Sequence, residues 1–360
     1  MIDMTNTPYI MVDLEQMEKN SRTIAQGLQA QNIKWRPHIK SHKSIFLAKK
    51  QLEWGAFAIT CATLGEAAVM AEGGFSDIFI AYPLVGKTKT MRYLALHEKI
   101  ATLRTLVNSI DAAKVLSETF EEAGRVAEVL IEVDGRFGRG GIKQEELLAF
   151  AKEIEKCKGL QIVGLCSYCG AQGAIKEEDA RKEDAKTEAQ VLINAAQLLK
   201  EAGFTIDILS SGSSVSARYP ECLVGLTEVR AGTCSFNDMK HVSLGTTTQE
   251  TAAVSVFATV VTLIAPGRAI VDAGSKTLTS DLSDAAGYGK VPSIGGTIVG
   301  LSEEHGFLEY PQEHQLKVGD SLEITPNHVC VVMNLADTVL GKDKDIEPFL
   351  IHIDARGMNR

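Results

Sequence analysis

Hydrophobic runs of four to eight residues recur along the first two thirds of the chain, and amphipathic stretches separate them. The runs are rich in β-branched and aromatic residues, which indicates buried strands, and the stretches between them have the apolar spacing of helices. Strands at intervals of about 20 to 45 residues are typical of parallel β/α units. With about eight such strands, the pattern favours a closed (β/α)8 TIM-type barrel over an open sheet. The expected strands lie at residues 33–35, 56–61, 77–82, 102–108, 127–134, 161–168, 207–212 and 226–230.

From about residue 246 the helical spacing nearly disappears. A long β-branched run covers residues 253–264, and short strands with Gly, Pro and Asp turns continue to the end. These features predict an all-β domain. We therefore expect a barrel domain at residues 1–246, followed by a C-terminal β domain at residues 247–360.

Composition narrows the classes of function. The 360 residues carry a net charge of −9, which argues against a general nucleic-acid or anionic-membrane surface. No apolar run reaches the length of a membrane span, and the N-terminus lacks the basic and apolar regions of a signal peptide. The seven cysteines are scattered and odd in number, which favours thiols in a reducing compartment. We expect a cytoplasmic protein that binds neither nucleic acid nor membranes.

A basic octet, Arg-Pro-His-Ile-Lys-Ser-His-Lys at residues 36–43, follows the strand at 33–35 and precedes a predicted helix at 45–56. Polar side chains at such a strand-to-helix junction face ligands in α/β folds. A desolvated lysine crowded by other cations has a lowered pKa, so Lys40 could serve as a Schiff-base nucleophile. The alternative is a solvated basic turn without chemistry.

Small polar loops follow the last two predicted barrel strands. Residues 210–216, Ser-Ser-Gly-Ser-Ser-Val-Ser, offer small side chains and exposed amides, and Arg-Ala-Gly-Thr at 230–233 follows the next strand. Ligands of β/α barrels lie at the carboxyl ends of the strands, where anions bind backbone N–H groups. The two loops therefore fit a phosphate.

A second chemical motif is Pro-Asn-His-Val-Cys at residues 326–330. Because alternate residues of a strand point to one side, His328 and Cys330 are expected to face a single ion. Imidazole and thiolate together favour Zn²⁺, although Mn²⁺ or a similar ion can occupy such a site. The alternative is a buried structural cysteine.

The octet and the His-x-Cys motif resemble those of pyridoxal-phosphate enzymes with the alanine-racemase type of barrel. The most similar branch contains D-threonine aldolases, D-serine dehydratases and 3-hydroxyaspartate lyases, and the resemblance covers nearly the whole chain. Segments 272–279, 302–306 and 355–357 are also similar to those of the aldolase branch. The resemblance implies that the first strand, at about residues 8–14, joins the β domain, and that the protein is a homodimer.

The resemblance also implies roles for single residues. Lys40 would be the catalytic lysine that holds pyridoxal 5'-phosphate as a Schiff base. Ser214, Gly232 and Thr233 would bind the phosphate of this cofactor. His328, as a catalytic residue, and Cys330 would hold a divalent metal, with Glu304 and His305 either supporting that metal or capping a turn.

Two further segments resemble cofactor contacts of the family. In residues 134–141, Arg139 is in register with a cofactor-binding arginine, but Arg136 stands where the family has a glycine. Tyr168 or Gln172 would hydrogen-bond the cofactor beside its ring. The alternatives are a solvated arginine turn at 134–141 and a tyrosine that caps the barrel core.

The expected activity is therefore a metal-dependent lyase acting on D-configured 3-hydroxy amino acids. D-threonine aldolase, which gives glycine and an aldehyde, is the first expectation, and it rests on the similarity of segment 272–279. The alternative is a D-serine or 3-hydroxyaspartate dehydratase that gives a 2-oxo acid and ammonia, favoured by the Cys330 ligand. A non-catalytic pyridoxal-phosphate carrier and an alanine racemase fit less well, because neither explains a metal motif in the β domain.

Overall fold

Eight parallel strands form the first sheet of the structure, a computed structural model that describes residues 4–169, 175–282, 287–344 and 346–360. Their order is β2-β9-β8-β7-β6-β5-β4-β3. The two ends of this order meet, because Thr60 N donates to Pro37 O at 2.9 Å and a parallel bridge joins His38 to Thr60. The strands are β2 (Lys34–Trp35), β3 (Ile59–Cys61), β4 (Asp77–Pro83), β5 (Thr102–Val107), β6 (Ala127–Val133), β7 (Leu160–Ser167), β8 (Ile208–Ser211) and β9 (Glu228–Val229).

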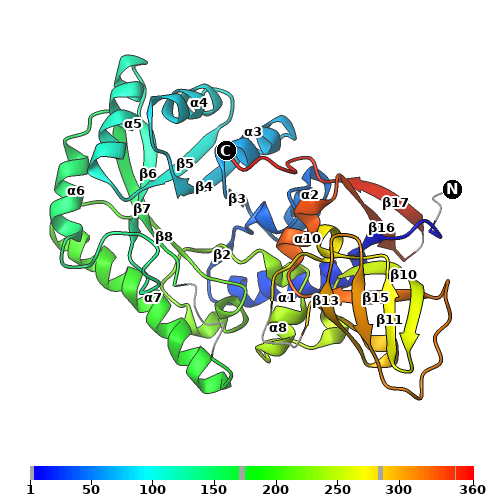
Figure 1. Cartoon of the computed structure of the whole chain (residues 1–360). Helices are drawn as coiled ribbons and strands as arrows, with labels where there is room; N and C mark the ends of the chain where they lie inside the picture. The colour runs from blue at the N-terminus through cyan, green and yellow to red at the C-terminus, as the bar shows by residue number, and fades with distance from the viewer. Residues whose placement is uncertain (1–3, 170–174, 283–286, 345) are drawn as a thin grey trace. The chain divides into compact units, whose positions relative to one another are not determined.

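Helices follow most of these strands and surround the sheet (Figure 1). Thr63 illustrates how the sequence starts them, because its hydroxyl accepts from Glu66 N at 3.1 Å while the Glu66 carboxylate accepts from Ala62 N at 2.6 Å. The helices are α3 (Leu64–Glu72), α4 (Lys87–His97), α5 (Ile110–Glu122), α6 (Leu147–Glu155) and α7 (Glu178–Glu201). Together with the sheet they form the larger of two compact units, residues 23–40, 51–232 and 358–360, which we name the barrel unit.

The barrel interior contains an apolar cluster contributed by neighbouring strands. Its members are Phe79, Leu106, Leu130, Val163 and Cys166. Full burial of each large apolar side chain contributes about 1.5–3 kcal/mol relative to an exposed one, so the cluster stabilises the sheet.

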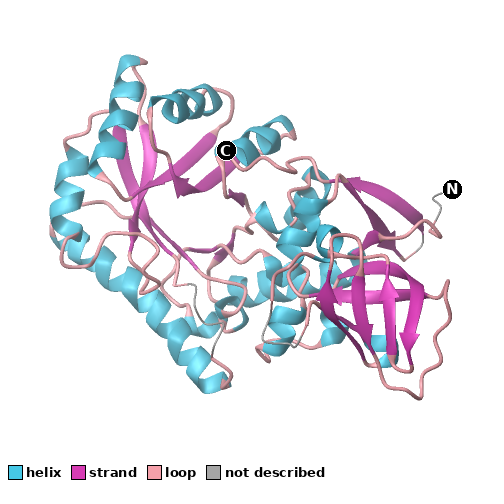
Figure 2. Ribbon diagram, in the orientation of Figure 1, coloured by secondary structure: helices cyan, strands magenta, loops and turns pink. Residues whose placement is uncertain are grey.

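The second unit, residues up to 22, 41–50 and 233–357, contains a mainly antiparallel sheet of nine strands, and we name it the β unit. The strand order is β11-β14-β13-β12-β15-β10-β1-β16-β17, and an additional pairing of β11 with β10 closes six of the strands into a small barrel. The strands stand out in Figure 2. They are β1 (Tyr9–Asp13), β10 (Val254–Ala265), β11 (Arg268–Val271), β12 (Gly289–Val291), β13 (Gly296–Leu301), β14 (Gly306–Glu309), β15 (Ser321–Pro326), β16 (Thr338–Asp343) and β17 (Ile346–His352).

Strand β1 lies inside this sheet, antiparallel to β10 and parallel to β16. The chain then enters α1 (Leu14–Ala30), and α2 (Ile45–Glu53) follows the basic octet. Short helices α8 (Met239–Ser243), α9 (Ser275–Leu278) and α10 (Val329–Leu335) interrupt the strands of the β unit. The predicted fold class, a β/α barrel followed by an antiparallel β domain, is confirmed.

The helix α10 corrects one detail of the prediction, which expected only strands after residue 246. Its sequence is rich in β-branched residues, but Val329, Val332 and Met333 are fully buried, and their spacing of three and four residues places them on one face of a helix. Burial of that face outweighs the strand preference of valine, since tertiary packing routinely overrides local propensity.

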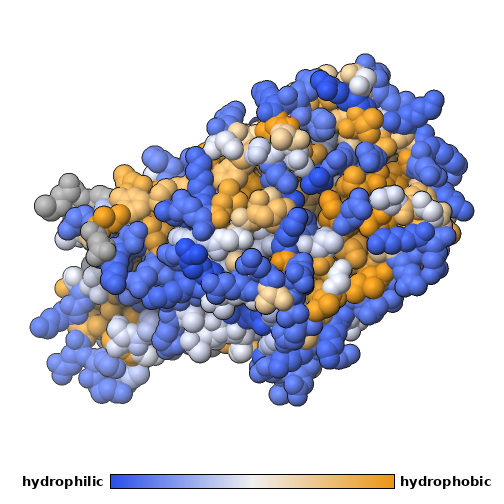
Figure 3. All heavy atoms as spheres, turned by 180° about the vertical axis from the view of Figure 1, so that it is seen from behind, coloured by the Kyte–Doolittle hydropathy of each residue, from blue (hydrophilic) through white to orange (hydrophobic). Residues whose placement is uncertain are grey.

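Hydrophilic side chains cover most of the face seen in Figure 3, with smaller apolar areas between them. Within the part of the chain that the structure describes, no helix has the length and hydrophobicity needed to cross a membrane. None of the seven cysteines, all of which lie in described segments, forms a disulfide.

Candidate active site

The predicted cofactor residues of the barrel unit follow different strands at one edge of the sheet. Because all eight strands are parallel, the segments after their carboxyl ends meet at this edge. Lys40 comes after β2, Arg139 after β6, Tyr168 after β7, Ser214 after β8 and Gly232 after β9. Gln172 lies outside the described residues, so its predicted role stays a prediction. Thr233, the next residue after Gly232, belongs to the β unit.

Positive charge gathers around the catalytic-lysine candidate. Lys40 is exposed and lies in a 3-10 turn at Ile39–Ser41. Burial lowers the pKa of His38 well below its ordinary value, and the charges of Lys40, Arg230 and Arg139 lower it further. The low pKa of His38 thus reflects its burial beside these basic side chains, which make this edge of the barrel attractive to an anion.

Arg139 and Tyr168 contact each other. The Arg139 guanidinium lies 4.5 Å from the centroid of the Tyr168 ring, and its Nη2 lies 4.0 Å from Glu132 Oε1. Asn108 Nδ2 donates to the other Glu132 oxygen at 2.7 Å, which holds that carboxylate in place. The two side chains that were predicted separately from the sequence therefore form one stacked pair.

The backbone explains the unusual arginine in this segment. Arg136 has a φ of 69°, in the left-handed region that favours glycine, and it stands where the resembling family has glycine. Its amide donates to Asp134 Oδ1 at 3.1 Å, and its guanidinium pairs with Asp184 at 3.1 Å. The segment therefore adopts, with an arginine, a backbone conformation that usually requires glycine.

The two predicted phosphate loops follow adjacent strands, β8 and β9. A Cβ atom at Gly232 would lie 2.3 Å from His38 O, so only glycine allows this loop to approach the segment that carries Lys40. In the other loop, Gly212 has a φ of 93°, and its amide donates to Glu188 Oε1 at 3.0 Å. Close backbone approach, small side chains and surrounding cations fit the phosphate of pyridoxal 5'-phosphate.

A buried polar network that sequence analysis missed lies beneath this edge. Arg230 Nη1 donates to Ser210 Oγ at 2.7 Å and Nη2 donates to Ser167 O at 2.6 Å. Glu228 accepts from the Ser210 hydroxyl at 2.7 Å and from Arg36 Nε at 2.9 Å. Glu228 and Arg230 lie two residues apart on either side of the apolar Val229, and this alternation is the signal that could have indicated that they face the same side.

His328 and Cys330 occupy a strand-to-helix junction rather than one strand. Strand β15 ends at Pro326, His328 is the extended residue before α10, and Cys330 lies in its first turn. The strand alternation used to predict their common orientation is therefore wrong. The side chains nevertheless meet, since a hydrogen bond with Cys330 raises the pKa of His328 to about 9 against the opposing effect of burial, with Asp238 and Asp281 raising it further.

Asp281 completes this arrangement and was not predicted. Its Oδ2 lies 2.7 Å from His328 Nδ1, which leaves Nε2 as the ring nitrogen for a ligand. A carboxylate on the second nitrogen is the usual partner of a metal-binding histidine, so the residues present fit a divalent ion. Among the described residues, no group of three or more His, Cys, Asp or Glu side chains could hold a metal ion. Glu304, one of two predicted supporting residues, pairs instead with Lys276 at 2.6 Å, and both are exposed.

Thr233 belongs to the same group of side chains. Its Oγ1 lies 3.5 Å from Cys330 Sγ. The role of Thr233 at the cofactor phosphate, which the resemblance implies, stays a prediction, and its hydroxyl lies beside the thiol of the metal motif.

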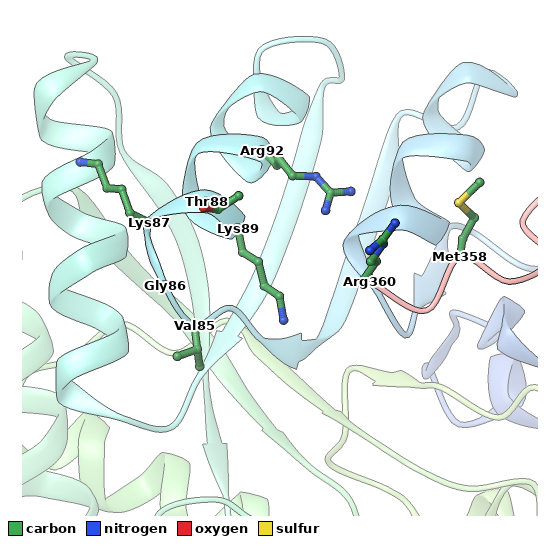
Figure 4. A pocket seen from close by; sticks show the side chains of 8 residues that line it. All are labelled: Val85, Gly86, Lys87, Thr88, Lys89, Arg92, Met358 and Arg360. Atoms are coloured by element: carbon green, nitrogen blue, oxygen red, sulfur yellow. The ribbon is translucent and has the colours of Figure 1, made fainter.

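A cavity of about 690 Å³ elsewhere in the barrel unit contains none of the predicted residues. Figure 4 shows Lys89, Arg92 and Arg360 around it, between the start of α4 and the last residues of the chain. These side chains are basic and at least partly exposed, and the cavity has no acidic lining residue among those described. Because none of the predicted cofactor or metal residues lines this cavity, we do not assign it to the candidate active site.

Comparisons with known proteins agree with this architecture. Residues 12–239 match the alanine racemase N-terminal domain, and residues 253–341 match a serine dehydratase domain. D-threonine aldolase from Arthrobacter sp. is 30% identical over 360 residues, covering 99% of this chain and 94% of the relative. D-threo-3-hydroxyaspartate dehydratase from Delftia sp. (strain HT23) is 31% identical over 347 residues, covering 90% of this chain and 91% of the relative.

A solved structure extends the comparison to three dimensions. A D-threo-3-hydroxyaspartate dehydratase, solved as a cysteine-to-alanine mutant in the metal-free form, has a TM-score of 0.90 and 28% sequence identity. The match covers 96% of this chain and 97% of that chain.

Proposed function

The chain belongs to the alanine-racemase-like family that includes D-threonine aldolase and D-threo-3-hydroxyaspartate dehydratase, and from this premise we propose that it is a pyridoxal-phosphate- and metal-dependent lyase of D-3-hydroxy amino acids. Within that class we propose retro-aldol cleavage of D-threonine to glycine and acetaldehyde. The lyase proposal rests on the His328–Cys330 pair in the β unit, together with the contact between His328 and Asp281. A non-catalytic pyridoxal-phosphate carrier or an alanine racemase would not require a metal motif in this unit.

In the barrel unit, Lys40 would hold the cofactor through its aldehyde, and Ser214 and Gly232 would bind its phosphate. Arg139, stacked on Tyr168, would add positive charge beside the ring. The bound cofactor supplies an electron sink for the bonds at the α-carbon of an amino acid. Lys40 Nζ would then exchange a proton with that carbon.

In the β unit, His328 Nε2 and Cys330 Sγ would hold the divalent ion, which supplies a Lewis acid for the 3-hydroxyl of the substrate. Asp281 would keep the imidazole ring oriented, with its proton on Nδ1 and the lone pair on Nε2. Imidazole with thiolate favours Zn²⁺ over the harder ions.

Two reactions begin from the same bound substrate. In the aldolase reaction the Cα–Cβ bond breaks, the 3-hydroxyl loses its proton and the α-carbon gains one, giving glycine and an aldehyde. In the dehydratase reaction the α-proton and the 3-hydroxyl leave, and hydrolysis gives a 2-oxo acid and ammonia. The similarity of segment 272–279 to the aldolase branch supports the first reaction, whereas Cys330 as metal ligand favours the second.

Product analysis with D-threonine tests the proposal. The aldolase yields glycine and acetaldehyde and leaves L-threonine unchanged, and Lys40→Ala abolishes the reaction. Formation of 2-oxobutanoate and ammonia instead of glycine would establish the dehydratase. A protein that binds the cofactor but converts neither D-threonine nor D-serine, with Zn²⁺ or Mn²⁺ added, would refute the lyase proposal and support a carrier.

A further inference from the structure

Residues 233–241 contact the metal motif on both sides of His328. The Thr233 hydroxyl lies 3.5 Å from Cys330 Sγ, and Asp238 Oδ2 accepts from Val329 N at 3.2 Å. On the other side, Lys240 N donates to Asn327 O at 3.2 Å. All of these residues belong to the β unit, and residues 233–241 therefore help to fix residues 327–330, together with Asp281 and Gly287, whose carbonyl oxygens accept from Asn327 Nδ2.

Thr233 is held rigidly at the start of this segment. Its carbonyl oxygen accepts from Phe236 N and Asn237 N, both at 2.9 Å, which closes a 3-10 turn at Thr233–Ser235. Asn237 Nδ2 donates to Thr251 Oγ1 at 3.0 Å and anchors the turn further. The backbone of Thr233, from which its hydroxyl projects towards Cys330, is therefore held by contacts outside the metal motif.

Asp238, five residues after Thr233, also contacts the metal motif. It is fully buried, and its Oδ1 accepts from His241 N at 3.1 Å and lies 2.7 Å from His241 Nδ1. Its other oxygen holds the first amide of α10. The carboxylate thus fixes the start of the helix that carries Cys330.

We propose that Thr233 is a positioning residue that orients the Cys330 sulfur for a divalent ion before the ion binds. The inference rests on the proposed function, because it requires Cys330 to be a metal ligand. As the thiolate forms, the Thr233 hydroxyl donates to sulfur, limits its rotation about the Cα–Cβ bond and withdraws some of its charge. Hydrogen bonds that orient metal ligands typically change metal affinity by about 10–100-fold.

Cobalt(II) titration of the metal-stripped full-length protein, with its cofactor bound, tests this role directly. Co²⁺ reports thiolate ligation through a sulfur-to-metal charge-transfer band, which Cys330→Ala should remove. Thr233→Val keeps the side-chain shape but loses the hydroxyl, so we expect about tenfold weaker Co²⁺ binding and a shift of this band to lower energy. Thr233→Ser keeps the hydroxyl and should retain the wild-type position of the band.

A matched control is Thr325→Val, which removes the hydroxyl of a buried threonine at the end of β15 that bonds Gln249 and not Cys330. It should leave the band and the affinity unchanged. An unshifted band in Thr233→Val overturns the inference even if the affinity falls, because a general loss of stability would not move the band selectively. If the wild-type protein shows no thiolate band, the metal role of Cys330 in the proposed function fails, and the positioning role fails with it.

Discussion

Replacing Gly232 by alanine is expected to weaken cofactor binding. The added Cβ would lie 2.3 Å from His38 O and 3.2 Å from His38 Cβ, whereas ordinary contacts of a Cβ begin near 3.4 Å. The nearest atom belongs to the backbone, so either the Gly232 loop or the segment leading to Lys40 must move by about 1 Å. Overpacking of this kind costs about 1–3 kcal/mol, which corresponds to an affinity loss of roughly 5–150-fold if the strain falls on the cofactor-bound state.

Titration of the cofactor-free variant with pyridoxal 5'-phosphate, followed by absorbance, measures this loss. Urea unfolding of the cofactor-free protein separates a weakened site from a destabilised barrel. Gly300→Ala is the matched control, since its Cβ would lie at an ordinary 3.4 Å from Phe307 in the β unit. Wild-type cofactor affinity in Gly232→Ala, with unchanged stability, would refute the argument that close approach at Gly232 shapes the site.

Three further predictions concern single side chains. Lys40→Ala should remove the yellow colour of the covalently bound cofactor. Borohydride reduction of the wild-type protein, followed by peptide mapping, should find the pyridoxyl group on Lys40, and finding it on the buried Lys43 would contradict the assignment. Cys330→Asp should shift the metal preference from Zn²⁺ towards Mn²⁺, because carboxylate oxygen is a harder ligand than sulfur. Activity assays of the enzyme after chelation and reconstitution with each ion measure this preference, and an unchanged preference would argue against metal ligation by residue 330. Glu188→Ala should lower the free energy of unfolding in urea by about 2–5 kcal/mol, because the buried Ser211 hydroxyl and Gly212 amide lose their acceptor. Glu188→Gln keeps an acceptor oxygen and should lower this free energy less. Equal losses in the two variants would show that the missing acceptor is not the cause.

The order of strands and helices in the barrel unit could be predicted from the sequence because local spacing determines it. The start of α3 shows this well, since its two capping hydrogen bonds, Glu66 N to Thr63 Oγ1 and Ala62 N to Glu66 Oε2, span three and four residues. The location of the cofactor candidates at one edge followed from the same pattern, because parallel strands bring their carboxyl ends together.

The surroundings of the metal motif depend on distant parts of the chain and were missed. Asp281 contacts His328 across 47 residues, and Thr233 contacts Cys330 across 97 residues, so no local pattern links either pair. The helix at Val329–Leu335 was missed for a related reason, because its valines favour strands until a core is present to bury one face. Local patterns predicted which residues carry the chemistry but not which residues support them.

The position of β1 has a consequence for synthesis on the ribosome. Tyr9 pairs with Phe257 and Met11 pairs with Leu340, so the first strand has no partner until the last third of the chain has been made. At a typical rate of about 5–20 residues per second, the apolar segment around Ile10 waits on the order of tens of seconds. The barrel strands, whose neighbours in the sheet are mostly neighbours in the sequence, can pair during that interval. The nascent chain therefore folds from its middle outwards, and its earliest residues are among the last to reach their native place.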